Sequence, residues 1–296
     1  MKSVAVLSIG AALLAGAMAG AGVVVIYSGA YNVAATSQHF QLVYSLLETT
    51  LRYSVRLRAR HIDPPALDDP QRILRGAALF RDKCVQCHGA PGVAPGDIGK
   101  SMQPLPGPLV DALQRWSTRE IYWITRHGIR MSGMPAWQFR LDDAQLWDVV
   151  AFVQRLPELT PQAYAEATQS VPLAAGMAAA PGGTFGLRLL PASPVKASAT
   201  QILPGNSERG RQTLYQYACS ACHTIPGVTG SSPNVGPPLK GLASRSLIAG
   251  KLVNTPDNLV LWLRHPKDVK PLTAMPDLGV NEPHARDIAA YLATLH

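Results

Sequence analysis

The sequence predicts an all-α protein in which an apolar N-terminal helix precedes two small helical domains built on one plan. Three observations support this prediction. From Val4 to Tyr27, 24 consecutive residues carry no charge. The pattern C-x-x-C-H occurs twice, at residues 84–88 and 219–223. Around each copy, apolar residues recur at helical spacing. The length of 296 residues suits about two domains of ordinary size.

The uncharged N-terminal run predicts a transmembrane anchor over residues 1–29. As a helix it spans roughly 36 Å, enough to cross a bilayer. A cleaved signal peptide is the alternative, since Ala17-Met18-Ala19 resembles an A-x-A cleavage site. Because the apolar run continues past Ala19, cleavage there would leave an apolar terminus in water, and we favour the uncleaved anchor. Lys2 marks the cytoplasmic side and places the rest of the chain outside.

Residues 30–67 predict a basic amphipathic stalk with a helix over 38–60. Apolar residues such as Tyr44, Leu51 and Val55 recur near helical spacing. Four arginines follow in the last turns, where cations suit the helix dipole. The segment is expected to be a stalk or packing helix, with an interfacial helix on anionic lipid or a partner complex as the alternative. The formal charge of the whole chain is +8, but no basic and aromatic stripe indicates nucleic acid.

The two C-x-x-C-H motifs predict covalent haem. They read Cys84-Val85-Gln86-Cys87-His88 and Cys219-Ser220-Ala221-Cys222-His223, and together they use every cysteine. This pattern is the attachment signature of c-type haem: two thiols add to the vinyl groups, and the histidine binds the iron. We therefore expect two haem c groups held by Cys84, Cys87, Cys219 and Cys222, with His88 and His223 as proximal ligands. Such haem is attached outside the cytoplasmic membrane, in agreement with the predicted topology.

Other uses of the cysteines explain less. A thioredoxin-type thiol pair would require a βαβ context, which is absent. A four-thiolate zinc site would need both pairs in one small fold, whereas about 130 residues separate them. Structural disulfides would leave the two histidines unexplained.

Both motifs lie in units of one plan, at 68–159 and 206–296, which indicates an internal duplication. Each unit reads as a helix, C-x-x-C-H, Pro/Gly-rich loops, a short helix, Met-Pro and a closing helix. In the first unit, the opening helix is expected over 70–83 and the closing helix is expected to start at 141–143. In the second unit, Asn206 or Ser207 is expected to cap the opening helix. A short helix is expected over 256–264, and Asn281 is expected to cap the closing helix. Residues 160–205, rich in Ala, Pro, Gly, Ser and Thr, are expected to be a linker.

A methionine in each unit is expected to be the second axial ligand. Met134-Pro135 lies 46 residues after His88, and Met275-Pro276 lies 52 residues after His223. Thioether sulfur stabilises ferrous iron and raises the potential. Met131, three residues before Met134, and His127 remain alternatives at the first site.

Each proximal imidazole is also expected to donate its second N–H to an acceptor. The carbonyl of Pro237 is the candidate partner of His223. For His88, the stretch 104–108 leaves the acceptor open.

These features resemble bacterial membrane-anchored di-haem cytochromes of the class I c type, over about 180 of 296 residues. The matching segments are Gly76-x-x-x-Phe80-x-x-x-Cys84, Gly133-Met134-Pro135-Ala136-Trp137, Gly236-Pro237-Pro238-Leu239, Thr273-Ala274-Met275-Pro276-Asp277-Leu278 and Ala290-Tyr291-Leu292. The resemblance implies two all-α cytochrome c-like domains with His/Met iron and a role in electron transfer. One departure is that Gly210 stands nine residues before Cys219, where Gly76 stands eight before Cys84, which puts the second helix crossing in doubt.

The resulting expectation is an electron carrier of the respiratory chain, without a catalytic residue of its own. It would be held in the cytoplasmic membrane with its haem domains on the periplasmic side, and would relay electrons between redox partners such as a dehydrogenase and a terminal oxidase. The alternatives are a di-haem enzyme of the peroxidase or thiosulfate-oxidising type, which needs an iron with an open position, and a haem subunit of a larger respiratory complex.

Overall fold

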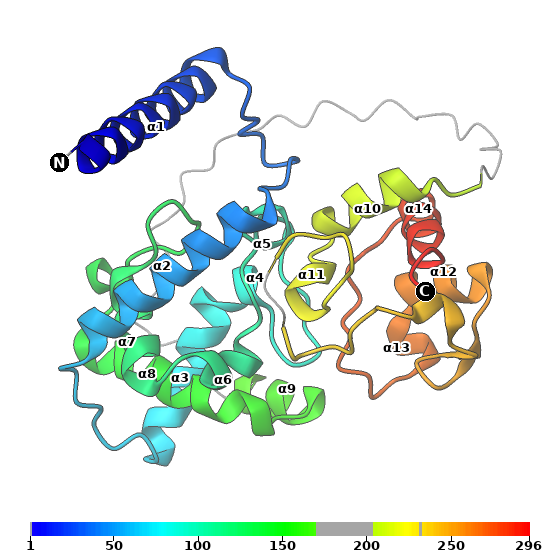
Figure 1. Ribbon diagram of the computed structural model, residues 1–296. Coiled ribbons are helices and arrows are strands. Elements are labelled where there is room, and N and C mark those ends of the chain that lie inside the picture. The colour runs from blue at the N-terminus through cyan, green and yellow to red at the C-terminus, as the bar shows by residue number, and fades with distance from the viewer. Residues whose placement is uncertain (1, 170–203, 231–232) are drawn as a thin grey trace, which may run out of the picture. The chain divides into compact units, whose positions relative to one another are not determined.

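The computed structural model describes residues 2–169, 204–230 and 233–296, and it divides into two units, 1–38 and 39–296 (Figure 1). Most of the predicted linker, 160–205, lies outside the described residues.

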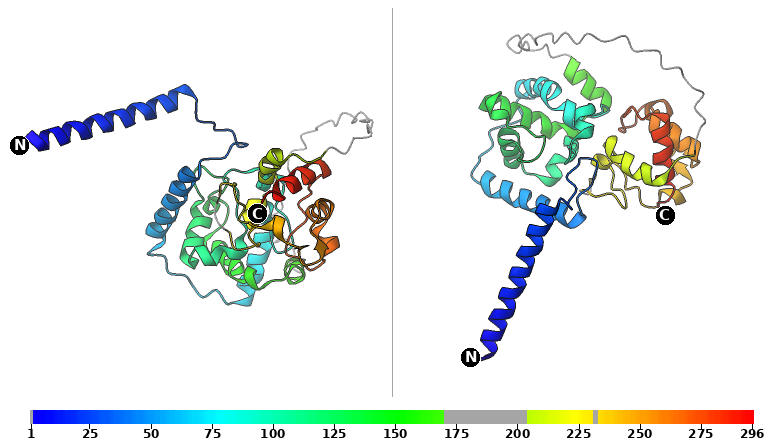
Figure 2. Two further views of the ribbon diagram at one scale, coloured as in Figure 1. Left: turned by 45° about the vertical axis from the view of Figure 1, so that its right-hand side comes forward. Right: turned by 90° about the horizontal axis from the view of Figure 1, so that it is seen from above.

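The first unit is built on α1 (Lys2–Ser28), one uninterrupted helix (Figure 2). Its stretch Val6–Ser28 has a mean hydropathy of 2.2, and none of it is buried. The helix ends before Gly29, whose φ of +67° lies in the left-handed region that glycine adopts without strain. By length and composition, α1 can cross a bilayer.

The second structural unit, 39–296, begins with α2 (Gln41–Ala59), which lies within the predicted stalk segment. Val55 and Ala59 on this helix are fully buried, and the helix packs against α7 (Thr118–His127). The side of α2 that carries Val55 and Ala59 is therefore part of the packing around the first C-x-x-C-H domain.

That domain contains only helices, apart from one isolated bridge between Ala90 and Val93. Besides α7 its elements are α3 (Pro70–Lys83), α4 (Val85–His88), α5 (Asp97–Ser101), η1 (Leu109–Asp111), α6 (Ala112–Arg115), η2 (Trp137–Phe139), α8 (Asp143–Arg155), η3 (Leu156–Glu158) and α9 (Pro161–Gln169). The opening helix has the predicted bounds. The closing helix is fixed by a capping box, in which Asp142 accepts from the Gln145 N–H and Gln145 accepts from the Asp142 N–H.

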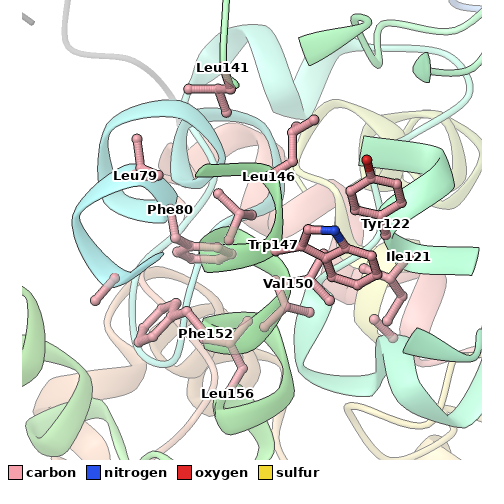
Figure 3. Packing of buried hydrophobic residues seen from close by; sticks show 14 of the residues in the cluster. Leu79, Phe80, Ile121, Tyr122, Leu141, Leu146, Trp147, Val150, Phe152 and Leu156 are labelled. Atoms are coloured by element: carbon pink, nitrogen blue, oxygen red, sulfur yellow. The ribbon is translucent and has the colours of Figure 1, made fainter. Parts of the chain in front are cut away.

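The core of the first domain lies where α3 crosses α8 (Figure 3). Gly76 lies against the backbone carbonyl of Asp148, and a Cβ at this position would lie 3.0 Å from that of Phe152. Only glycine permits this approach. One turn later, Phe80 meets Phe152 with ring centroids 5.3 Å apart.

Helix α9 lies in a segment that was predicted to be linker. The Thr160 hydroxyl accepts from the Ala163 N–H at 3.1 Å, and Pro161 occupies the first helical position. Tyr164, 4 % exposed, packs its ring against Phe80 with centroids 6.4 Å apart. This tertiary contact holds a nine-residue helix that is too short to be stable alone.

The second domain repeats the plan with α10 (Ser207–Gln216), α11 (Cys219–Cys222), η4 (Leu242–Ser244), α12 (Pro256–Arg264), α13 (Pro266–Val269) and α14 (Glu282–Leu292). As predicted, α12 spans 256–264, Asn206 caps α10 and Asn281 caps α14. A two-stranded antiparallel hairpin, β1 (Leu247–Ile248) and β2 (Leu252–Val253), is added; Leu247 pairs with Val253.

The doubt about the second helix crossing is removed by the structure. α10 packs against α14, and Gly210 lies on the Asp287 carbonyl as Gly76 lies on that of Asp148. The extra residue is absorbed by Ala218, whose φ of +55° places it in the left-handed region between α10 and α11. The two domains therefore share one crossing and differ in the turn that follows it.

Candidate haem-binding sites

Both C-x-x-C-H motifs lie on a short helix directly after the opening helix of their domain. The Cys84 N–H donates to the Phe80 carbonyl at 2.9 Å, so the first motif continues the hydrogen bonding of α3. All four cysteines are within the described ranges, and none forms a disulfide. Burial raises the pKa of Cys84 and of Cys219 to about 12, and that of Cys222 to about 11.

The histidines of the two motifs are held in the same way. Nδ1 of His88 lies 2.6 Å from the Gly107 carbonyl, and Nδ1 of His223 lies 2.7 Å from that of Pro237. A carbonyl only accepts, so Nδ1 donates and Nε2 keeps its lone pair, the form that binds a metal. Burial lowers the pKa of both histidines, which keeps them neutral. The predicted Pro237 contact is confirmed, and the open choice within 104–108 falls on Gly107.

Glycines next to the motifs leave room for these rings. A Cβ on Gly236 would lie 2.5 Å from Cε1 of His223 and 2.7 Å from its Nδ1. In the first domain, a Cβ on Gly99 would lie 2.7 Å from the Cα of Cys87. Each motif is thus packed against a backbone that admits no side chain. In the second domain, one short segment supplies both the glycine that leaves room for the His223 ring, Gly236, and the carbonyl that accepts from its Nδ1, that of Pro237.

The two Met-Pro segments have the same kind of backbone turn. The backbone N–H of Met134 donates to the Ser132 hydroxyl at 3.2 Å, and that of Met275 donates to the Thr273 hydroxyl at 3.2 Å. Both methionines are half-buried. The hydroxyl two residues before each methionine is visible in the sequence as Ser-x-Met and Thr-x-Met, but no role was predicted for it.

The structure separates Met134 from its neighbour Met131. Met131 is 93 % exposed and has a left-handed φ of +58°. By contrast, the carbonyl of Met134 accepts from Ile129 N–H at 3.1 Å, which ties its loop to the domain. Met102, which was not among the predicted site residues, lies with its thioether against Gly133. The loop before Met134 therefore has a second sulfur beside it.

His127, the alternative ligand of the first site, lines a surface cavity of about 460 Å³ beside α2 and α7. Its ring lies 4.9 Å from that of Trp123, and burial lowers its pKa. The residues that line this cavity are Arg58, Ile62, Asp63, Tyr122, Trp123, Arg126, His127, Asp143 and Trp147. None of them belongs to a C-x-x-C-H motif or a Met-Pro turn, so the geometry gives no support to His127 as a ligand.

At each helix crossing an exposed arginine pairs with a buried aspartate, a contact that was not predicted from the sequence. Arg75 binds both carboxylate oxygens of Asp148, at 2.8 and 3.2 Å, and Arg209 binds both of Asp287, at 2.9 and 3.0 Å. Each arginine directly precedes the crossing glycine, and each aspartate lies on the closing helix. Bidentate arginine–carboxylate pairs fix geometry, so the pair aligns the two helices. An Arg-Gly pair matched with an aspartate in the closing helix was the available signal.

Contacts within unit 39–296 join the two domains. Nζ of Lys100 on α5 donates to the Leu278 carbonyl at 3.2 Å, and Asn234 donates to Gln114 at 3.4 Å. Helix α5, which packs on α4, also packs on α10. These contacts bring the segment after the first motif next to the helix before the second.

One ion pair lies between the two motifs. Arg115 donates to Asp111 at 3.0 Å, and Asp111 is 4 % exposed. The guanidinium of Arg115 lies beside Gly107, the acceptor of His88. On the other side, the pKa of Cys222 is raised by burial and, in addition, by the nearby Asp111 carboxylate. The first domain thus places a charged pair next to both attachment sites.

The arrangement fits haem c and does not fit the metal alternative. Each domain contains paired free thiols, a neutral imidazole with Nε2 available and a half-buried thioether in its Met-Pro turn. Among the described residues, no group of three or more His, Cys, Asp or Glu side chains could hold a metal ion, which removes the zinc site. When bound, the haem iron supplies reversible one-electron oxidation and reduction.

Comparison with known proteins agrees with this geometry. Residues 71–153 match the family described as Cytochrome C oxidase, cbb3-type, subunit III, and residues 207–296 match the family Cytochrome c. Cytochrome c2 of Rhodopila globiformis is 34 % identical over 105 residues, which cover 31 % of this chain and 95 % of that protein. Cytochrome c oxidase subunit 2 of Alkalihalophilus pseudofirmus is 34 % identical over 92 residues, covering 30 % of this chain and only 25 % of that protein. No solved structure matches.

The two family matches coincide with the two helical domains of the structure, and each includes one C-x-x-C-H motif. Almost the full length of a cytochrome c2 is covered by the match. The chain therefore belongs to the cytochrome c family, as an electron-transfer haem protein whose two cytochrome c domains carry covalently bound haem c.

Proposed function

We propose that this protein is a membrane-anchored relay, in which electrons enter at one haem and leave from the other. Cys84, Cys87, Cys219 and Cys222 attach the haems. His88 and Met134 bind the first iron, and His223 and Met275 bind the second. Helix α1 remains uncleaved as the anchor, and the haem domains lie on the periplasmic side of the cytoplasmic membrane.

The observation that carries this proposal is the matched pair of methionine turns. Met134 and Met275 have the same hydroxyl-capped backbone and the same half-buried position. With histidine and methionine both bound, neither iron has an open position for a substrate. This favours electron transfer over the chemistry of a di-haem peroxidase or a thiosulfate-oxidising cytochrome.

The contacts between the domains support transfer within one chain. The bonds from Lys100 to Leu278 and from Asn234 to Gln114 hold the domains together close to their attachment motifs. Electron transfer slows steeply with distance, so such packing shortens the path between two haems. The Asp111–Arg115 pair lies in the same region.

A terminal oxidase is the proposed acceptor. The match of the first domain to the cbb3-type subunit III family and the similarity to an oxidase subunit 2 support this direction of flow. A haem subunit within a larger respiratory complex is the second candidate, favoured by the same matches. The two differ in whether the protein stays bound to its acceptor.

Spectroscopy of the oxidised protein tests the relay. Two low-spin haems and no peroxide turnover are expected, together with the weak sulfur-to-iron band in the far red. A high-spin band with peroxide turnover would instead identify an enzyme. At the first site, Met134→His should remove that haem's share of the band and Met131→His should leave it; the reverse result would move the ligand to Met131.

Partners are tested by purification from native membranes in mild detergent. Stable co-purification with an oxidase would identify a complex subunit, and reduction of an added oxidase by the isolated protein would support the relay. If the isolated protein accepts electrons from a dehydrogenase but reduces no oxidase, the proposed acceptor is wrong.

A further inference from the structure

Helix α2 has an apolar face that the fold leaves exposed. Leu42, Leu46, Tyr53 and Leu57 are 72, 60, 66 and 57 % exposed. We call these four residues the outer stripe. Their separations of four, seven and four residues place them on one side of the helix. Val55 and Ala59, which are fully buried, lie on the opposite side.

The helix is thus apolar on two sides, and only one of them is used by the domain. A surface helix that merely covers a core carries polar residues on its outer face. Four large apolar side chains aligned along 16 residues of an outer face indicate that something apolar covers them. Exposure of single hydrophobic residues elsewhere, such as Leu272 at 73 %, has no such alignment.

Arginines border the outer stripe. Arg56 lies beside the outer stripe, and Arg60 follows in line with it at the C-terminal end of the helix, whereas Arg58 lies farther round the helix. Arg58 donates to the carbonyl and hydroxyl oxygens of Ser54, at 3.1 and 2.7 Å, neither of which carries a charge. Arg56 is half exposed although it pairs with Glu120 at 3.7 Å. An apolar stripe bordered by arginines is the pattern of a helix that lies in a membrane interface.

The chain keeps α2 within reach of the bilayer. Only residues 29–40 separate the end of α1 from the start of α2. Twelve residues span at most about 40 Å when fully extended. If α1 crosses the membrane, the N-terminal end of α2 is therefore confined close to the lipid surface, at high effective concentration for binding it.

We propose that the outer stripe of α2 inserts into the headgroup region of the membrane that anchors the chain, with the flanking arginines on anionic phospholipids. This inference rests on the proposed anchoring by α1. Because α7 packs on the other side of α2, the helix becomes the layer between the bilayer and the first haem domain. Anionic headgroups and arginines attract each other, and buried leucine and tyrosine side chains add the apolar contribution.

Site-directed spin labelling of the full chain tests the proposal. With the native cysteines bound to haem, one introduced cysteine is the single free thiol. Leu42→Cys and Leu57→Cys report on the outer stripe, Leu272→Cys in the second domain is the matched exposed control, and Met18→Cys reports on the anchor. Each labelled protein is reconstituted in vesicles of phosphatidylethanolamine and phosphatidylglycerol, and its haem spectrum is checked against the unlabelled protein.

The readout is the ratio of collisions with oxygen, which dissolves in lipid, to collisions with a water-soluble nickel complex. The ratio at Leu42 and Leu57 is expected to be severalfold higher than at Leu272. A ratio at Leu42 and Leu57 equal to that at Leu272 overturns the proposal. The same result is expected if the outer stripe binds a protein partner instead of lipid. If the labels are immobilised and become mobile when the protein is diluted in lipid, the outer stripe contacts a second copy of this chain, and this result also overturns the proposal.

Met18 separates this inference from the proposed function. A label at Met18 deep in the bilayer with water-exposed labels on the stripe overturns only the inference about α2. A water-exposed label at Met18 overturns the anchor, and then a lipid-exposed stripe would still establish that α2 binds the membrane by itself.

Discussion

Replacing Gly210 with alanine should force α10 away from α14 and destabilise the second haem domain. The added Cβ would lie 2.5 Å from the carbonyl carbon of Asp287 and 3.0 Å from the nitrogen of Ile288. These are backbone atoms of a buried helix, so no side chain can rotate to make room. The bidentate Arg209–Asp287 pair holds the two helices in this register.

The expected magnitude follows from two opposing contributions. Alanine in a helix interior is favoured over glycine by about 1 kcal/mol. Overpacking a tight contact typically costs about 1–3 kcal/mol, and a contact with backbone belongs at the upper end. The net loss should be about 2 kcal/mol, which lowers the melting temperature of a domain of this size by roughly 8–16 °C.

Thermal unfolding of the oxidised full-length protein, followed by visible circular dichroism of the haems, measures this change. Gln216→Ala, at an exposed position of the same helix, is the control for helix propensity and should leave the midpoint nearly unchanged. Gly76→Ala should act in the same way on the first domain, where the Cβ would meet the Asp148 carbonyl. A midpoint of Gly210→Ala at or above that of the wild type would refute the close crossing.

Three further changes probe the second haem domain. Met275→His should lower the potential of the second haem and remove its share of the far-red band, because imidazole favours ferric iron more than thioether does. An unchanged potential in a redox titration would exclude Met275 as the ligand of the second iron. Gly236→Ala should displace His223 and lower the ratio of covalent haem to protein, measured as pyridine haemochrome; full occupancy would show that the ring does not need this glycine. The hydrogen bonds from Arg209 hold the pKa of Asp287 below its usual 3.8, so its contribution to stability is complete above that pH and is lost as the pH falls through the folded-state pKa. Asp287→Asn should therefore flatten the acid side of a denaturation profile, and an unchanged slope would contradict this.

Local chemistry determined much of what could be predicted from the sequence. The C-x-x-C-H spacing identified the cofactor, because only the two thiols and the adjacent imidazole are needed to recognise it. The predicted bounds of α3 and α12 agree with the structure, in which each helix has a proline at its first residue. Pro237 could be named as the partner of His223 because it lies in the loop that follows the motif.

Tertiary contacts decided the remainder. The partner of His88 could not be chosen within 104–108, because the selection of Gly107 depends on how the loop packs around Arg115. Helix α9 has a weak sequence pattern and is held by Tyr164 in the core of the first domain. The ion pair of Arg75 with Asp148 joins residues 73 positions apart, a distance that no local pattern spans.

The second crossing shows the difference most clearly. The sequence by itself determined that Gly210 is one residue farther from its motif than Gly76, and the mismatch made the crossing uncertain. Only the tertiary structure decided that the helices still cross at this glycine, because the left-handed turn at Ala218 takes up the extra residue. Likewise, periodicity predicted that α2 is amphipathic, but its packing on α7 decided which side is buried and which apolar side remains outside. A sequence pattern gives the faces of a helix, whereas their partners depend on contacts between segments far apart in the chain.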